Sequence, residues 1–304
     1  MELRQLETFC AVVRSGSFSR AAEEMYLSQP AVSLHIKALE SELGVMLFER
    51  SGRSVRLTQP GELFHEYAVR IIQLLQEAHQ TLSETASGEK GRIVVGAGAT
   101  TTIFTLPPVL QTLRSDHSGI EVIIRSGTSR EVARMVRAGE VDLGLVTSPV
   151  GEENLITCIL QEDKVVAVVG RDHPLASAQC VTLAEFAQEP LILFVRGSGF
   201  RSYLDAVFAG QGITPQVQME LDNVEAIKAL VEIGLGASLV PEVAVRSEIS
   251  DGRLVPLAIM DIPQLSRSLS LIYRKDKHLS PTMKVFLTVL DSLGHELQEP
   301  SSTT

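Results

Sequence analysis

The sequence predicts a multidomain chain of mixed α and β structure: a small helical domain with a β-hairpin, one long helix, and a larger α/β domain. Three observations support this prediction. Residues 17–40 have the pattern of two short helices joined by a tight turn, and an apolar seam with heptad spacing follows from residue 64. From residue 92 onward, short apolar strands alternate with helical segments. At 304 residues, the chain is long enough for two or three domains.

Composition and charge narrow the class of protein. The three cysteines are far apart and match neither a disulfide framework nor a zinc site, which favours a reducing cytoplasm. We expect neither secretion nor membrane insertion, because no apolar run approaches about 18 residues and the N-terminus lacks a signal-peptide pattern. The net charge of −10 disfavours DNA binding only at first sight, since residues 1–58 carry seven basic and seven acidic side chains and are neutral.

Local signals predict the first two helices. Leu6, Phe9 and Val13 recur at helical spacing and give the segment 3–13 one apolar face, which Ser15-Gly16 ends. Ser17 is then a suitable N-cap for the second helix, in which the small side chains of residues 21 and 22 allow close helix packing.

The segment that begins at Ser28 predicts a helix able to enter the DNA major groove. Ser28 is its N-cap, Pro30 occupies the first turn, and Gly44 ends it. Glutamine can bond adenine and serine can reach a base or a phosphate, whereas the alternative is an ordinary solvated face. The candidate DNA-contacting residues of this segment are Ser28, Gln29, Pro30, Ser33, Leu34 and Lys37.

Residues 47–58 predict a β-hairpin with a Ser-Gly turn and a basic tip. A hairpin of this kind beside a helix pair commonly contacts the DNA backbone or minor groove, and a solubilising loop is the alternative. Its candidate DNA-contacting residues are Arg50, Arg53 and Arg56.

A long helix is predicted from Thr58, with Pro60 in its first turn. Its apolar positions are spaced four and three residues apart over nearly three heptads, which predicts pairing with a second copy of the chain. Packing against its own domain is the alternative. The candidate dimerisation residues are Phe64, Ala68, Ile71, Leu75, Ala78 and Leu82.

The remainder predicts a doubly wound α/β structure. The sequence has more apolar strands than one compact lobe can hold. A break at 161–164 and a return at 262–268 therefore indicate two lobes joined by two crossing segments. We therefore expect domains at 1–58, 59–91 and 92–304, with lobe I at about 92–161 and 267–304 and lobe II at about 162–266.

Ligands of open α/β sheets bind beyond the carboxyl ends of the strands. In this chain those ends carry hydroxyls, glycines and helix N-termini, with arginines on one side, which favours a small anion such as an organic carboxylate or an inorganic oxyanion. Alternatively, the hydroxyls serve only as helix caps. The candidate ligand-binding residues are Thr100, Thr101, Thr102, Gly127, Thr128, Thr147, Arg196, Ser198, Phe200 and Arg201.

Enzyme motifs are incomplete in this sequence. Gly96-Ala97-Gly98 begins like a dinucleotide fingerprint, but Thr101 occupies the position of the third glycine. Gly197-Ser198-Gly199 lacks the spacing of a nucleophile elbow. No phosphate-binding loop with Lys-Ser/Thr and no His/Glu metal motif is present in the sequence, so we expect no catalytic residue, no metal and no cofactor.

The whole chain resembles the LysR-type transcriptional regulators. The most specific pattern is FxxVxxxxSFSxAAxxxxxSQPAVSxxIxxLExxLGxxLFxR, matched here from Phe9 to Arg50 and followed by Leu57-Thr58 and Gly61. The resemblance implies a winged helix-turn-helix, a long linker helix and a two-lobed, periplasmic-binding-protein-like effector domain.

The resemblance also implies a function. A member of this family would be a cytoplasmic homotetramer, a dimer of dimers, that binds an inverted repeat in double-stranded promoter DNA and responds to a small-molecule co-inducer in the cleft between its lobes. RNA polymerase is a further candidate partner. Carried over to this chain, Gln29, Pro30 and Ser33 would meet the DNA groove and Arg53 would lie at the wing. Many members have Arg where this chain has Leu34, which removes an expected contact to guanine or phosphate. The alternative function is a solute-binding protein that does not bind DNA.

Overall fold

Three helices and a hairpin pack around one apolar core at the N-terminal end of the chain. The computed structural model describes residues 1–51, 54–87, 91–147, 154–178, 180–262 and 265–292, and the chain divides into two units, Met1–Ala86 and Ser87–Thr304. The first unit comprises α1 (Leu3–Ser15), α2 (Phe18–Glu24), α3 (Gln29–Leu43), β1 (Phe48–Ser51), β2 (Ser54–Leu57) and α4 (Gln59–Ser87).

Helix boundaries in this unit follow the predicted caps. The Ser17 hydroxyl accepts from the Arg20 N–H and the Ser28 hydroxyl accepts from the Ala31 N–H. Gly16 and Gly44 end α1 and α3 at φ values of 63° and 70°, where a residue with a Cβ would be strained. The predicted hairpin is confirmed as the antiparallel pair β1–β2, with Phe48 opposite Leu57.

The core of the first unit corrects part of the dimerisation prediction. Ala68 is fully buried in this core and Phe64 packs against it, with its ring 5.1 Å from that of Phe9. These two positions of α4 are therefore used within their own unit, as the alternative interpretation proposed, because α4 starts directly behind the hairpin and its first turns cover the three-helix core. Ile71, Leu75 and Leu82 are exposed in the single chain.

The second unit consists of two lobes. Lobe I contains β3 (Gly91–Ala97), a π-helical turn η1 (Thr101–Thr105), α5 (Leu106–Asp116), β4 (Ile120–Ser126), α6 (Ser129–Arg137), β5 (Leu143–Thr147) and the last helix, α11 (Pro281–Ser292). The first part of lobe II contains the short helix η2 (Pro174–Ser177), β7 (Cys180–Val181), α7 (Leu183–Phe186), β8 (Leu191–Phe194) and α8 (Gly199–Gly210). Its remaining elements are β9 (Val217–Leu221), α9 (Val224–Glu232), β10 (Ser238–Pro241), η3 (Glu242–Ala244), α10 (Arg246–Ser250) and β11 (Leu254–Ile259).

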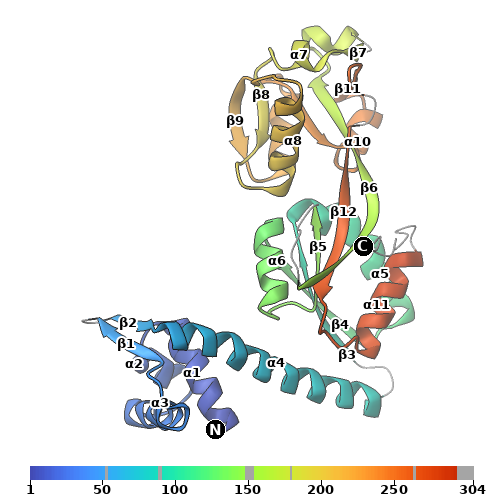
Figure 1. Cartoon of the computed structure of the whole chain (residues 1–304). Coiled ribbons are helices and arrows are strands. Elements are labelled where there is room, and N and C mark those ends of the chain that lie inside the picture. Colours follow the sequence, from blue (N-terminus) through green and yellow to red (C-terminus); the bar gives the residue numbers. More distant parts are fainter. Residues whose placement is uncertain (52–53, 88–90, 148–153, 179, 263–264, 293–304) are drawn as a thin grey trace, which may run out of the picture. The chain divides into compact units, whose positions relative to one another are not determined.

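Two long strands, β6 (Leu155–Gly170) and β12 (Ser266–Arg274), join the lobes (Figure 1). They run antiparallel to each other from Ser266 opposite Lys164 to Arg274 opposite Leu155. The first part of β6 therefore pairs with β12, and its second part lies between β10 and β11.

The sheet differs from the predicted doubly wound form. Its order is β4-β3-β5-β12-β6-β11-β7, with β10 also paired to β6. In lobe I, β3, β4 and β5 form a parallel set, and in lobe II β11 pairs with β7 and β8 pairs with β9 in parallel. The long strands β12 and β6 break the expected pattern, because β12 runs antiparallel to β5 and β6, and β6 runs antiparallel to β10 and β11. Residues 161–164 do cross between the lobes as expected, but the strand is not interrupted there, because β6 continues through them. The polar residues there lie on a strand that is half exposed between the lobes rather than in a loop.

Separate apolar cores stabilise the two lobes. In lobe I the buried faces of β3, β5 and β12 pack against α5 and α11, with Leu106 and Phe286 fully buried. In lobe II the strands β8 and β10 pack against α8 and α9 around Phe186 and Phe208. Close packing of α6 on the sheet also requires Gly144, because a Cβ there would lie 2.6 Å from the Val132 side chain.

Candidate functional site

The exposed face of α3 presents the predicted DNA-contacting residues. Val32, Ile36 and Leu39 are buried on the opposite face, which leaves Gln29, Lys37 and Leu34 toward solvent, Leu34 at 67% exposure. Gln29 Nε2 donates to Ser33 Oγ at 3.0 Å, so the two polar side chains hold each other in the unbound chain. Binding to a base would require this intrahelical hydrogen bond to be exchanged for contacts to the base edge.

A buried hydrogen bond fixes α3 against α1. Thr8 Oγ1 donates to the Arg4 carbonyl at 2.6 Å, so its only proton is committed and it accepts from His35 Nδ1 at 2.9 Å. Thr8 is fully buried, which makes this contact costly to lose. His35, which follows Leu34, therefore has a structural role that the sequence did not reveal.

The hairpin is held against α3 by one carboxylate. Glu40 Oε1 accepts from the backbone N–H groups of Leu47 and Phe48, at 2.9 and 3.3 Å. Thr58 Oγ1 donates to the Met46 carbonyl at 2.6 Å and accepts from the Gly61 N–H at 3.0 Å, which caps α4 as predicted. The orientation of the hairpin thus depends on Glu40 and Thr58, both of which are half-buried.

The basic residues of the hairpin are only partly described. Arg56 lies in β2 and is exposed, and Arg50 lies in β1 opposite Val55. Arg53 lies outside the described residues. The DNA-contacting role of all three remains a prediction.

The second candidate site is a cavity of about 340 Å³ between the two lobes of the second unit. It lies where the carboxyl ends of the strands meet: Thr100 and Thr101 follow β3, Gly127 and Thr128 follow β4, and Thr147 ends β5. Lobe II contributes the residues that follow β8 and β9. These are Val195, Ser198, Gly199, Phe200 and Asp222, together with Phe194 from β8 itself.

Three helical segments begin at this cavity: η1 follows Thr100, α6 follows Thr128 and α8 follows Ser198. The Thr128 hydroxyl caps α6 in a reciprocal arrangement with Glu131, whose carboxylate accepts from the Thr128 N–H at 2.7 Å. The hydrogen bonds from Thr128 hold the pKa of Glu131 below its usual value. Ser198 caps α8, and no described residue accepts from the backbone N–H groups of Gly199 and Phe200. The hydroxyls of Thr128 and Ser198 are thus helix caps, as the alternative interpretation held, and they line the cavity as well.

The buried cation of the cavity is Arg267 in β12, which the sequence did not predict. Its side chain pairs with Asp163 of β6 at 2.9 Å and lies over the Phe200 ring, with the guanidinium carbon 4.5 Å from the ring centre. Burial lowers the pKa of Arg267, and the charge and hydrogen bonds of Asp163 act in the opposite direction. The same strand positions that join the lobes therefore supply a charged wall to the cavity.

The arginines predicted for this role lie elsewhere. Arg201 is buried, and it donates to Asp205 at 2.7 Å, to Glu220 at 3.0 Å and to the Phe194 carbonyl at 2.8 Å. Arg196 pairs with Glu220 at 3.2 Å and keeps a 79% exposed side chain. Neither lines the cavity, because β9, a strand the sequence did not predict, places Glu220 beside both of them.

Thr102 also differs from the prediction. Its hydroxyl donates to the Gly98 carbonyl at 3.0 Å, within the turn that starts η1, and it is not among the residues that line the cavity. The other seven predicted ligand-binding residues do line it. They are Thr100, Thr101, Gly127, Thr128, Thr147, Ser198 and Phe200. The ligand-binding role of these seven residues remains a prediction.

The π-helical turn η1 links the cavity to lobe II. Thr101 lines the cavity, and Phe104, three residues later, packs against the lobe II core. The Phe104 ring lies 5.5 Å from Nζ of Lys228 in α9. Such π-helical turns are frequently found at functional sites.

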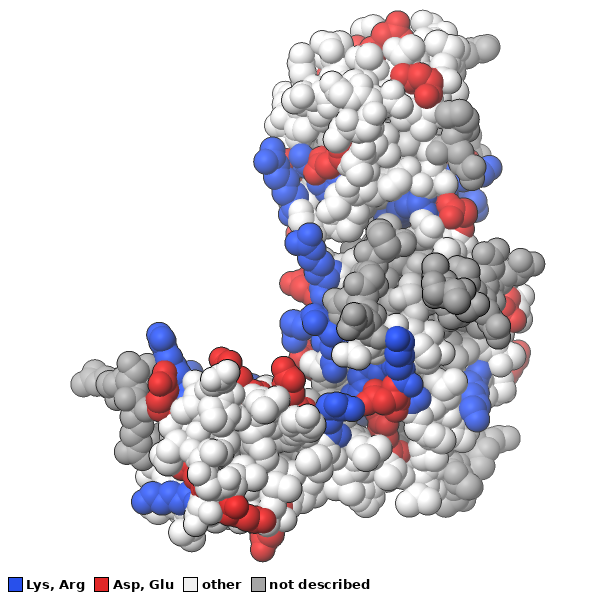
Figure 2. Space-filling view, viewed as in Figure 1, with Lys and Arg blue, Asp and Glu red and all other residues white. Residues whose placement is uncertain are grey.

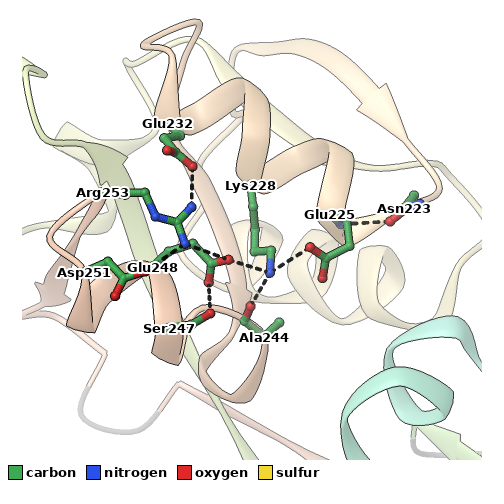
Figure 3. A network of polar contacts seen from close by, with 9 residues as sticks. All are labelled: Asn223, Glu225, Lys228, Glu232, Ala244, Ser247, Glu248, Asp251 and Arg253. Atoms are coloured by element: carbon green, nitrogen blue, oxygen red, sulfur yellow. Dashed lines mark hydrogen bonds and ion pairs between the residues drawn. The ribbon is translucent and has the colours of Figure 1, made fainter.

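Lys228 belongs to a buried polar network (Figure 3). Its Nζ donates to the Ala244 carbonyl at 2.8 Å and pairs with Glu225 and Glu248 at 3.0 Å each. Burial disfavours ionisation of Glu248, but hydrogen bonds led by that from Lys228 outweigh it and hold its pKa below the usual value. Arg253, which directly precedes β11, continues the network to Glu232 of α9 at 2.8 Å and to Glu248 of α10 at 3.7 Å, so these two helices and the start of β11 are braced together.

In the view of Figure 2, basic and acidic side chains lie beside one another over the middle of the second unit. Within the described residues, no helix is long and apolar enough to span a membrane, and no group of three or more His, Cys, Asp or Glu side chains could hold a metal ion.

The winged helix-turn-helix and the two-lobed ligand domain define a DNA-binding transcriptional regulator with an effector domain. Residues 3–62 match the model of the bacterial regulatory helix-turn-helix proteins of the lysR family, and residues 86–294 match that of the LysR substrate binding domain. The chain belongs to the LysR family, whose members are transcriptional regulators rather than enzymes.

Individual relatives agree with this assignment. The chain is 34% identical over 287 residues to the RuBisCO operon transcriptional regulator of Allochromatium vinosum, covering 94% of each chain. Full-length CbnR complexed with its target DNA is 25% identical and superposes with a TM-score of 0.66, over 96% of this chain and 99% of CbnR. The effector binding domain of QuiR in complex with shikimate is also 25% identical, with a TM-score of 0.61 over 67% of this chain and 97% of that domain.

Proposed function

We propose that this LysR-family regulator binds an inverted repeat in promoter DNA through α3 and the hairpin, and changes those contacts when a small anionic metabolite enters the cavity of its second unit. The family match over residues 3–62 excludes the alternative of a solute-binding protein without DNA function. The proposed place of action is the cytoplasm.

The DNA-facing part of the proposal rests on α3. Gln29, Ser33 and Leu34 occupy consecutive turns at the capped end of the helix, and the helix N-terminus favours a phosphate. Leu34 would contact a thymine methyl group rather than a guanine. CbnR is described in complex with its target DNA, which supports binding by the same domain here.

We propose that α4 pairs with a second copy of the chain. The exposed apolar side chains of α4 continue past its first turns, which pack on the three-helix core. They include Leu63, Tyr67, Ile71, Leu74, Leu75 and Leu82. A helix with such an unpartnered seam is stabilised by association, and a dimer matches two half-sites of an inverted repeat. A dimer of dimers, and contact with RNA polymerase, remain proposals of the same kind.

The observation that carries the ligand proposal is the convergence of helix N-termini on the cavity. The first backbone N–H groups of α8 have no described acceptor, and α6 and the η1–α5 segment also begin at the cavity wall. Backbone N–H groups at helix N-termini favour negative charge. Binding of shikimate, a carboxylate, by the related QuiR domain supports the same class of ligand. A volume of about 340 Å³ lies within the range of small-molecule sites.

A gel-shift experiment tests the DNA part directly. The full chain is titrated at low salt onto the fragment upstream of its own gene and onto a scrambled fragment of the same length. We expect retardation of the upstream fragment at a concentration at least tenfold lower than that of the scrambled fragment. Equal retardation of both fragments contradicts sequence-specific binding by this chain.

A further inference from the structure

Arg267 is the one cationic side chain that lines the cavity within the described residues, and it is only 7% exposed. It stands near the start of β12, directly across from Asp163 in β6. Its flat guanidinium lies over the Phe200 ring, so one face is covered by an aromatic side chain of lobe II. The group is therefore held in one orientation, by a carboxylate at its edge and a ring on its face.

Part of its hydrogen-bonding capacity is unused. Nε and Nη2 both donate to the same oxygen, Oδ2 of Asp163, at 3.1 and 2.9 Å. A guanidinium carries five N–H donors, and no described residue accepts from Nη1 of Arg267. Nη1 is not sealed from solvent, so its protons are available to water or to a ligand in the cavity.

Resting on the function proposed above, we infer that Arg267 binds the oxyanion group of the effector, a carboxylate or phosphate on a small organic molecule. The free Nη1 and the remaining Nη2 proton form an end-on pair of donors, which matches two oxygens of such a group. Gly199 and Phe200, at the start of α8, line the same cavity, and their backbone N–H groups have no described acceptor. Charged guanidinium and uncharged backbone donors would then share one anion.

The acidic residues of the cavity do not oppose this assignment. Glu131 and Asp222 are exposed, and the Glu131 carboxylate is already occupied by the N-terminus of α6. Exposed charges are screened by solvent and salt, whereas the buried Arg267 is screened much less. Asp163 is the acid that matters, because it holds the guanidinium directly and competes for it with an incoming anion.

This competition gives opposite effects for the two partners. Without Arg267, the anion loses its charge-assisted hydrogen bonds, which are worth roughly ten- to a hundredfold in affinity. Without the negative charge of Asp163, Arg267 is uncompensated and the anion should bind more tightly. A merely structural ion pair would give a loss in both cases.

The experiment measures the apparent affinity of the full chain for inorganic sulfate, phosphate and a panel of small carboxylates by thermal shift, against sodium chloride at equal ionic strength. The variants are Arg267→Gln, Asp163→Asn and the double variant, with Arg196→Gln as a matched control on an exposed arginine outside the cavity. We expect the first to weaken anion binding at least tenfold, the second to strengthen it, and the control to leave it unchanged. The double variant removes both charges, so a loss of binding in it cannot be attributed to an unpaired buried acid.

Full anion binding in folded Arg267→Gln overturns the inference, as does a loss in Arg196→Gln or weaker binding in Asp163→Asn. Stabilisation of the wild-type chain by carboxylates or phosphate beyond that of sodium chloride supports the inference, and no stabilisation by any of the three anions beyond that control contradicts it. The gel shift described above is independent of these variants, so failure of DNA recognition is distinguishable from failure of the Arg267 assignment.

Discussion

The proposed DNA-contacting surface of the first unit and the cavity of the second are built in different ways. The surface comes from consecutive turns of one helix, α3, whose start and end are set by its own neighbours Ser28 and Gly44. The cavity takes its walls from six segments of both lobes, and its cation comes from a strand far along the chain from the other wall residues. A surface on one helix can therefore be encoded by neighbouring residues, whereas a cavity built from several segments depends on the tertiary fold.

The largest expected effect is on the seam of α4. Ile71→Asp should dissociate the proposed dimer, because pairing would bury two unpaired carboxylates, each costing several kcal/mol. We expect the dissociation constant to rise by about 1,000-fold or more. Light scattering over a concentration series measures it, with Gln76→Asp on the same helix as the control. An intact oligomer in Ile71→Asp would place the dimer contact outside this seam.

Glu40→Ala should destabilise the first unit and leave the second unchanged. The substitution leaves the N–H groups of Leu47 and Phe48 without their acceptor, at a cost of about 2–4 kcal/mol in the free energy of unfolding. Denaturant unfolding followed on each unit checks this, and Glu40→Gln, which keeps an acceptor oxygen, should lose less. Equal destabilisation by Ala and Gln would mean that these two hydrogen bonds contribute little.

Gln29→Ala should affect sequence reading alone. We expect a loss of about 1–3 kcal/mol in binding to the cognate fragment and little change on scrambled DNA, because a base contact is lost while phosphate contacts remain. Titration of both fragments by fluorescence anisotropy at fixed salt gives the two affinities. The same loss on both fragments would show that Gln29 contributes to affinity without reading the base.

The smallest effect is expected in the cavity. Thr100→Val keeps the side-chain shape and removes one hydroxyl, so anion binding should weaken by roughly three- to tenfold, the worth of a neutral hydrogen bond. DNA binding without ligand should stay at the wild-type level. Altered DNA affinity in the unliganded variant would break the proposed separation of the two regions.

The sequence predicted what is encoded by neighbouring residues. Caps such as Ser17 and Ser28 act within three residues of their own position, so the helix-turn-helix could be anticipated in detail. The sequence also predicted that Thr100, Thr128 and Thr147 lie near one another. They follow or end parallel strands, and parallel strands bring their carboxyl ends to one edge of the sheet.

The parts that could not be predicted depend on distant pairing. Arg201 was expected in the cavity, but β9 brings Glu220 to it and commits its donors to the lobe II core. Arg267 was missed because its role arises from pairing with Asp163, more than a hundred residues earlier in the chain. In sequence, its neighbourhood at the start of β12 carries no motif. The only available signal was that an arginine lies where the chain was expected to cross between lobes.

The most direct test of the account is the position of an anion in the second unit. Crystals of the full chain grown without sulfate or phosphate are soaked in selenate, and the selenium is located by anomalous scattering. We expect a peak inside the cavity, within hydrogen-bonding reach of Arg267 Nη1 and the first N–H groups of α8. A peak at the exposed Arg196 instead, with none in the cavity, would contradict it.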